Sequence, residues 1–243
     1  MVRFGCRCDI EEMTALAEVG YEFAETDARV LYPRLDGAAF RQARQAVLAH
    51  SLFPEVVRAP GLLDEMGGDE SELSLREAFR RAALVGAKVV VVRAPRVERS
   101  ERAEAWRQAA QALGALGEPA ARNGLAVAVA AGGRGSVAET LEEAWVLTEE
   151  VGHRAVGLAA DLAAPDSVHD LAAAGPSVKH VWLPLPRRYG GTVETTACLE
   201  ALGDLAELGY RGRVSVAEDW TGYADVAGEL LEELRAYGRG RAQ

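Results

Sequence analysis

Titratable side chains follow several short apolar runs of this chain, at positions where parallel strands would end. The candidate acids and bases are Asp161, His50 and Glu25, because carboxylates and imidazoles can accept and donate protons. Basic residues follow other runs and could contact a ligand. These basic residues are Arg93, Arg134, Arg187 and Arg188. The pattern predicts a polar site in which charged groups converge.

Each of these candidates also has an interpretation that needs no ligand. Asp161 fits a buried salt bridge with Arg93 or Arg134 as well as it fits ligand contact. Glu25 is equally suited to accepting hydrogen bonds from loop amides. His50 is more often a satisfied polar residue than a catalytic base. At the level of sequence, structural and functional roles remain open for all three candidates.

Eight apolar runs alternate with eight segments that carry helix signals, and this alternation is what would position the candidates. Alternation at this spacing predicts a parallel sheet, and eight units favour closure into an α/β (β/α)8 barrel over an open doubly wound sheet. No composition break divides residues 1–243, so one barrel domain is expected. The runs predicted as strands are residues 2–8, 21–27, 46–52, 88–93, 125–131, 155–161, 178–183 and 214–216.

Two connecting segments have features of their own. Residues 53–70 form a long loop with proline and glycine, a length typical of functional lids or flexible segments. Residues 132–135 read Gly-Gly-Arg-Gly before Ser136, which with Glu139 forms a capping box for a helix running through Glu150. This turn could cradle a phosphate at the helix start, although a plain tight turn fits its spacing better.

Composition excludes several classes of function. The net charge of −10 disfavours nucleic acid and anionic membrane surfaces as partners. No run of about 18 apolar residues is present to span a membrane. The cysteines Cys6, Cys8 and Cys198 make no disulfide framework and have no zinc-site spacing. A reduced, cytoplasmic protein is expected.

Five segments, taken in order, resemble the xylose-isomerase-like barrels, a family of sugar and sugar-phosphate isomerases and epimerases that includes the endonuclease IV group. The segments are LGAKVVVVR, GLAVAV, VGLAADLA, KHVWLPLPRRYGG and GYRGRVSVAEDW. HSLFPEV is similar to a proline-containing loop of the epimerase branch. The resemblance covers nearly the whole chain. It implies a small polyol, sugar or sugar phosphate as ligand and leaves open a homodimer.

The resemblance also implies a divalent-metal site whose ligands this chain mostly lacks. In the family a Glu, an Asp, a His and a Glu end strands 5 to 8 and hold one ion that polarises the sugar carbonyl. The corresponding residues here are Ala130, Asp161, Trp182 and Ala217. We therefore predict no tightly bound metal and no other cofactor. Mn²⁺, Mg²⁺ or Zn²⁺ would bind only if a bulge turned Glu218 inward beside Asp161.

The same resemblance suggests roles for the remaining residues at the strand ends. Arg187 or Arg188 matches a family arginine that contacts substrate hydroxyls or phosphate. Trp182 and Trp220 could stack on a sugar ring, or Trp182 could fill the volume that a metal and its ligands would otherwise occupy. His180 lies within a strand and is expected to be a core histidine.

Two functions remain in view. The first is a sugar or sugar-phosphate isomerase or epimerase whose activity is altered or independent of metal. The second is a non-catalytic binding or regulatory protein on the same barrel, because both acid–base Glu positions are alanine. An endonuclease IV-like nuclease is excluded, since it needs several zinc ligands and a basic surface.

Overall fold

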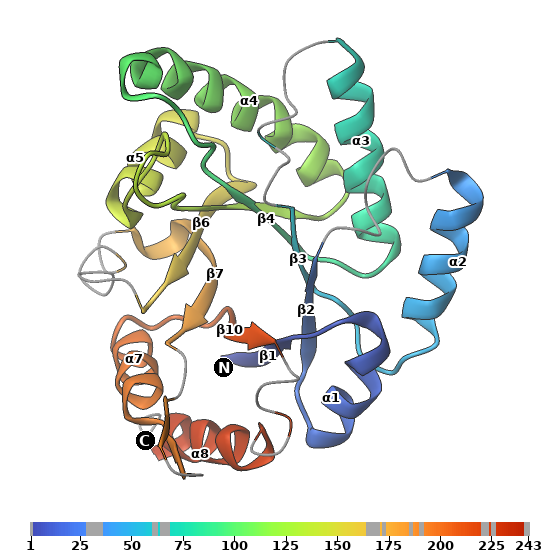
Figure 1. Ribbon diagram of the computed structural model, residues 1–243, viewed down its shortest axis with the longest axis vertical. Coiled ribbons are helices and arrows are strands. Elements are labelled where there is room, and N and C mark those ends of the chain that lie inside the picture. Colours follow the sequence, from blue (N-terminus) through green and yellow to red (C-terminus); the bar gives the residue numbers. More distant parts are fainter. Residues whose placement is uncertain are drawn as a thin grey trace.

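In the computed structural model of this protein, eight parallel strands close on themselves in the order β1-β10-β7-β6-β5-β4-β3-β2, and helices surround them (Figure 1). The structure describes residues 2–27, 36–59, 63, 69–163, 171, 174–184, 187–189, 192–219, 224 and 227–240. Within these ranges the side chains of residues 69–75, 187–189, 192–194, 217–219 and 239–240 are not described. The predicted (β/α)8 barrel is confirmed.

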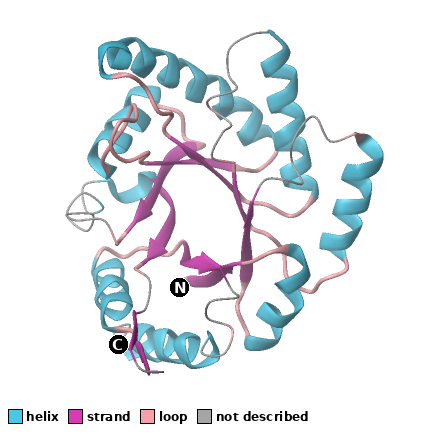
Figure 2. Ribbon diagram, viewed as in Figure 1, coloured by secondary structure: helices cyan, strands magenta, loops and turns pink. Residues whose placement is uncertain are grey.

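The strands form the inner ring and the helices the outer one (Figure 2). The barrel strands are β1 (Arg3–Arg7), β2 (Phe23–Asp27), β3 (Val56–Arg58), β4 (Val89–Arg93), β5 (Ala126–Ala130), β6 (Val156–Asp161), β7 (Val178–Leu183) and β10 (Arg213–Asp219). The helices are α1 (Met13–Val19), α2 (Gly37–Leu48), α3 (Asp69–Leu84), α4 (Arg102–Arg122), α5 (Leu141–Val151), α7 (Thr196–Glu207) and α8 (Ala227–Gly240). Two short strands, β8 (Arg187–Tyr189) and β9 (Thr192–Glu194), form a separate antiparallel pair that we did not predict.

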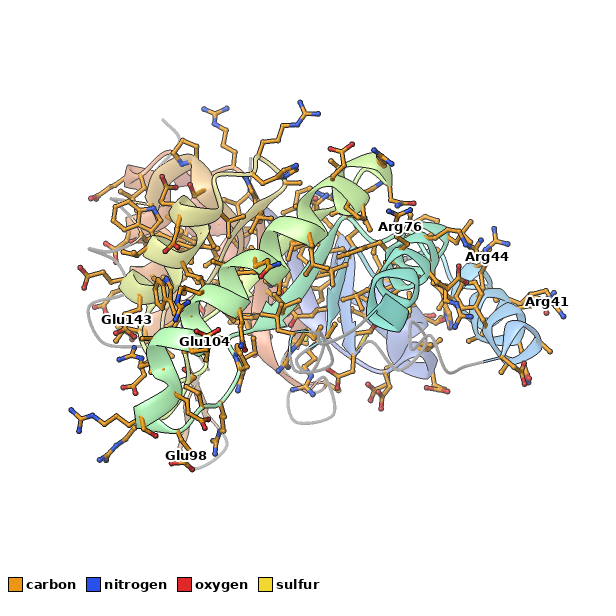
Figure 3. The ribbon with its side chains drawn as sticks, turned by 90° about the horizontal axis from the view of Figure 1, so that it is seen from above. Arg41, Arg44, Arg76, Glu98, Glu104 and Glu143 are labelled. Atoms are coloured by element: carbon orange, nitrogen blue, oxygen red, sulfur yellow. The ribbon has the colours of Figure 1, made fainter. Side chains whose placement is uncertain are left out.

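Local chemistry explains where the helices begin and which face they bury. The Asp36 carboxylate accepts the amides of Ala38 and Ala39, both at 2.8 Å, and so starts α2. The helices pack their apolar faces on the outside of the barrel, where one large core cluster joins them to the strands. Charged side chains such as Arg41, Glu98 and Glu104 lie on the outer surface (Figure 3). Among the described residues no helix is long and apolar enough to cross a membrane.

The strand predicted at residues 46–52 is wrong. Helix α2 continues to Leu48 because Val47 extends the buried face begun by Phe40, seven residues earlier. The third strand is instead Val56–Arg58, inside the segment that we had predicted to be a loop from residue 53 to 70. A three-residue strand that follows Pro54 gives too short a run to show the alternation of a strand.

The predicted capping box at Ser136 is also wrong. Helix α5 begins at Leu141, and its cap is Thr140, whose hydroxyl accepts the amide of Glu143 at 3.2 Å. Ser136 is buried and donates its hydroxyl to the carbonyl of Ala138 at 2.7 Å. Residues 132–135 therefore do not lead directly into a helix N-terminus, and the phosphate interpretation loses its structural basis.

Two features fill the amino end of the barrel. The Glu55 carboxylate accepts hydrogen bonds from Arg3 and Arg213, each at 2.7 Å, and so ties the starts of β1, β3 and β10 together. The fully buried ring of Phe23 packs against this ionic cluster. The guanidinium carbon of Arg3 lies 5.9 Å from the centroid of the Phe23 ring. A Cβ atom at Gly5 would stand only 2.2 Å from this ring. Gly5 is therefore required for Phe23 to occupy the barrel axis.

Replacing Gly5 by alanine should destabilise the protein by about 1–3 kcal/mol, because the new methyl group overpacks the lumen against Phe23. Urea-induced unfolding measures the change. Gly114→Ala in α4 is the matched control, since nothing lies within 4 Å of its added Cβ, and it should stabilise by roughly 0.5–1 kcal/mol. The loss should shrink when Phe23→Leu is combined with Gly5→Ala. Strict additivity of the two changes would contradict the contact.

Candidate functional site

A buried carboxylate, Glu25 of β2, organises the middle of the barrel lumen. Its oxygens accept hydrogen bonds from the indole nitrogen of Trp182 at 2.9 Å, and Oε2 lies 3.0 Å from Nε2 of His180. Arg58 of β3 approaches Oε1 with its Nε at 3.8 Å. The side chains of Glu25 and His180 are completely buried. Residues of three strands, β2, β3 and β7, therefore converge on one charge.

The strand register brings these residues together. Trp182 pairs with Ser215 of β10, which lies beside Gly5 of β1, and β1 in turn pairs with β2. His180 precedes Trp182 by two residues and so faces the same side of the sheet. The rings of His180 and Trp182 meet edge to face, with centroids 5.2 Å apart. Closure of the barrel is therefore what places β7 donors opposite a β2 carboxylate.

The surroundings keep Glu25 charged. Burial raises the pKa of its carboxyl, but the hydrogen bond and charge of His180 and the charge of Arg58 outweigh burial and lower the pKa overall. Nε2 of His180 is the nitrogen that faces Glu25, and Nδ1 has no hydrogen-bond partner among the described residues. A carboxylate so stabilised and enclosed is a weak base that a ligand does not reach.

These contacts revise our expectations for the lumen residues. Glu25 lies inside β2 and accepts from side chains, not from loop amides. His180 is buried as predicted, with a polar partner. Trp182 is 8% exposed and packs in a lumen cluster. Arg58 was missed altogether, because its strand was placed wrongly; the only sequence signal was the Val-Val-Arg run after Pro54.

The other predicted acid and base lie apart from this cluster. The prediction that His50 ends a strand is wrong: it follows α2 and precedes β3, at the amino end of the barrel, where its Nδ1 lies 2.8 Å from the Thr14 hydroxyl. Asp161 does end β6, but it is exposed and accepts the Ala163 amide at 3.0 Å. The buried salt bridge that we considered for Asp161 is therefore wrong.

The arginines predicted to bind substrate fall into two groups. Arg93 ends β4 and is exposed, with Ala130 as its register partner on β5. Arg134 is exposed in the turn between β5 and α5. Arg187 and Arg188 lie on β8, where only the backbone is described. Trp220 lies outside the described residues.

The positions that the resemblance assigns to metal ligands can be placed on the barrel. Ala130 ends β5 in the lumen cluster, and Trp182 holds the equivalent place on β7. On β10 the register with β1 shifts so that Cys6 pairs with Val216 but Arg7 pairs with Asp219. The shift spans Ala217 and Glu218, and it is the bulge on which a ligand role for Glu218 depends.

A divalent metal does not fit the side chains that the structure describes. No group of three or more His, Cys, Asp or Glu side chains gathers among them in a way that could hold an ion. The residues with suitable donors are committed elsewhere: Glu25 and His180 bind each other, and the thiol pKa values of Cys6 and Cys8 are raised by burial, that of Cys8 to about 12. No chemical step through a metal is therefore derived from these residues.

Comparison with known proteins identifies the family. A family model described as Xylose isomerase-like TIM barrel matches residues 13–170, more than half of the chain. The chain therefore belongs to the xylose isomerase-like TIM barrel family. A search of curated proteins finds no match.

Solved structures of sugar epimerases share the fold over almost the whole chain. A D-psicose 3-epimerase determined in the presence of D-fructose has a TM-score of 0.75 at 13% identity and covers 97% of this chain and 99% of its own. A D-tagatose 3-epimerase-like protein gives 0.74 at 18% identity, with 99% and 100% covered. The 3-keto-D-glucoside 4-epimerase of E. coli gives 0.71 at 18% identity, with 97% and 100% covered. At these identities the likeness concerns the fold.

Removing the Glu25 carboxylate should destabilise the protein strongly. In Glu25→Ala the donors of His180 and Trp182 lose their acceptor inside the barrel, and we expect a loss of about 3–5 kcal/mol in the free energy of unfolding at pH 7. Urea-induced unfolding measures it. Glu18→Gln, which changes an exposed glutamate on α1, is the control and should stay within about 0.5 kcal/mol of the wild type.

The effect of the charge should depend on pH. Because the folded-state pKa of Glu25 lies below its ordinary value of 4.5, the stabilisation is complete above that value and is lost as pH falls through the folded-state pKa. The stability difference between wild type and Glu25→Gln should therefore narrow below about pH 4.5. A difference that stays constant down to the folded-state pKa and beyond would contradict a charged Glu25.

Proposed function

We propose that this protein binds a small sugar, polyol or sugar phosphate at the carboxyl end of its barrel without a divalent metal. On this proposal it has lost the metal-assisted isomerisation or epimerisation that the family resemblance implies. The observation that carries the proposal is the hydrogen bond from the Trp182 indole to Glu25. It fixes an aromatic ring where a metal-binding histidine would be expected.

The indole changes what this position can do. An indole nitrogen donates a hydrogen bond and offers no lone pair to a metal. Its proton is already directed at Glu25, so the ring is held in place by the lumen. The residue is 8% exposed, and on this proposal the exposed part of the ring packs against the apolar face of a sugar.

The described side chains offer few groups that could act as a general acid or a general base. Epimerisation beside a carbonyl needs an acid and a base on opposite sides of the carbon. Ala130 and Ala217 have no titratable group, and Glu25 is enclosed with a lowered pKa. Asp161 alone remains exposed at a strand end among the candidate acids and bases. One such group supports binding better than turnover.

A second candidate is a working metalloenzyme that recruits Glu218. The register shift at Ala217 and Glu218 favours it, because a bulge re-aims side chains beside a site. Asp161 and Glu218 would then be the first two oxygen ligands. A metal site would need further ligands as well. The described side chains do not supply them, so they would have to come from the rest of the chain.

Metal titration separates the two candidates. A site filled at a hundred times its dissociation constant would add about 2.7 kcal/mol of stability, which is several degrees in Tm for a chain of this size. We expect Mn²⁺, Mg²⁺ and Zn²⁺ each to leave the Tm of the wild type unchanged. A rise of several degrees that disappears in both Glu218→Gln and Asp161→Asn would establish the second candidate instead.

Ligand binding without turnover is the direct test of the proposal. Calorimetry with a panel of ketoses, aldoses and sugar phosphates should show binding by at least one in the presence of a chelator. NMR in D₂O should then show no deuterium entering the carbon beside the carbonyl of that ligand. Exchange of that hydrogen by the chelated protein would mean that metal-independent proton transfer has been retained. Failure of every sugar to bind would refute the proposal.

A further inference from the structure

We propose that Arg58 and Arg93 form an anion-binding subsite at the carboxyl ends of β3 and β4, and that the ligand of this barrel is an anionic monosaccharide. The inference rests on the proposed function for the sugar itself. It adds the chemical class, a sugar bearing a carboxylate or a phosphate, and the two residues that select it.

Arg58 has capacity to bind that the protein leaves unused. Its single ion-pair contact among the described residues is the one to Glu25, at 3.8 Å, which is too long for a hydrogen bond. No described residue accepts a hydrogen bond from its guanidinium. The side chain is 20% exposed, so it is mostly buried yet open to the mouth. The five N–H donors of this planar group therefore have no matched acceptor among the residues that the structure describes.

Glu25 does not account for Arg58. The carboxylate already accepts hydrogen bonds from His180 and Trp182 at 3.0 and 2.9 Å. The guanidinium lies 6.0 Å from the centroid of the Trp182 ring, close enough for an attraction between the cation and the ring face. Both contacts are made by the guanidinium group, and neither is a hydrogen bond.

Arg93 faces the same space. Its strand neighbour Val91 pairs with Arg58 and belongs to the lumen cluster, and residues two apart on a strand share a face. Arg93 therefore lies on the lumen side of β4, about 7 Å further toward the carboxyl end than Val91. It is exposed and makes no ion pair with any described residue. Both residues therefore lie on the lumen side of neighbouring strands, with Arg93 further toward the carboxyl end.

Apart from Glu25, the nearby acidic groups whose side chains are described have other partners. Asp27 is engaged by Arg7 at 3.1 Å. Asp161 lies two strands away from β4 and accepts the Ala163 amide. The register partner of Arg93 is Ala130, whose side chain offers no acceptor. Among the described side chains, the charge of Arg58 faces Glu25 alone and that of Arg93 has no ion-pair partner.

Paired guanidinium groups select for planar or tetrahedral oxyanions. Arginine binds carboxylate and phosphate through two parallel N–H···O bonds, and such charge-assisted bonds are stronger than those to a neutral hydroxyl. A neutral ketose offers only uncharged oxygens to these donors. The pair should therefore favour an anionic sugar over its neutral counterpart.

The test compares neutral and anionic probes. Calorimetry with D-fructose, D-fructose 6-phosphate and D-gluconate should show that at least one anionic sugar binds tenfold or more tightly than D-fructose. Arg58→Gln and Arg93→Gln should each reduce that preference at least fivefold. Comparing the phosphate with the carboxylate probe identifies which anion is preferred.

Two variants guard against misfolding and general charge effects. Arg58→Lys keeps a charge near Glu25 and should retain the fold, while losing most of the anion preference because it lacks the planar fork. Arg41→Gln removes an exposed arginine on α2, at the outer edge of the molecule, and should change nothing (Figure 3). An anion preference that survives both glutamine substitutions, or equal binding of neutral and anionic sugars, would overturn the subsite.

Failure of the subsite can be told from failure of the proposed function. Binding of neutral sugars without any anion preference would keep the function and reject the subsite. If no sugar binds, inorganic phosphate still tests the arginines, because a rise in Tm with phosphate that is lost in Arg58→Gln and Arg93→Gln would support the subsite without a sugar. No effect of phosphate or of any anionic sugar would reject it.

Discussion

A charge held away from water must be matched by donors and by opposite charge, and Glu25 imposes this requirement at the centre of the barrel. An unpaired buried carboxylate would be prohibitively unstable. The protein meets the requirement with His180, Trp182 and Arg58, taken from β7 and β3. Each of these side chains is thereby restricted in orientation, so the geometry of the whole lumen follows from one charge.

The lumen is built in layers whose chemistry alternates. Arg3 and Arg213 bind Glu55 at the amino end, and the Phe23 ring separates that ionic layer from the layer of Glu25. Aromatic volume on the axis reduces the water that could reach the middle layer. Because Phe23 fits only beside a residue without a Cβ, Gly5 contributes indirectly to the electrostatics of Glu25.

Sequence reasoning reached the architecture but only part of the site. Strands with four or more apolar residues, such as the Val-rich β4, can be recognised in the sequence, and their order predicts a closed barrel. The three-residue β3 cannot be recognised in this way, so Arg58 was not predicted to be a lumen residue. The contact between Glu25 and Trp182 joins residues 157 positions apart. Local patterns carry no information about such pairs, which depend on barrel register.

Trp182 and Glu25 must be regarded as one unit when this barrel is compared with metal-binding relatives. Exchanging the indole for a histidine would remove a donor from a buried carboxylate and would still leave Ala130 and Ala217 without ligands. A metal at the mouth would also stand near Arg58, whose positive charge would oppose it. The described part of the lumen is therefore arranged around a fixed carboxylate that the protein's own donors already satisfy, and the positive charge of Arg58 beside it opposes a divalent ion.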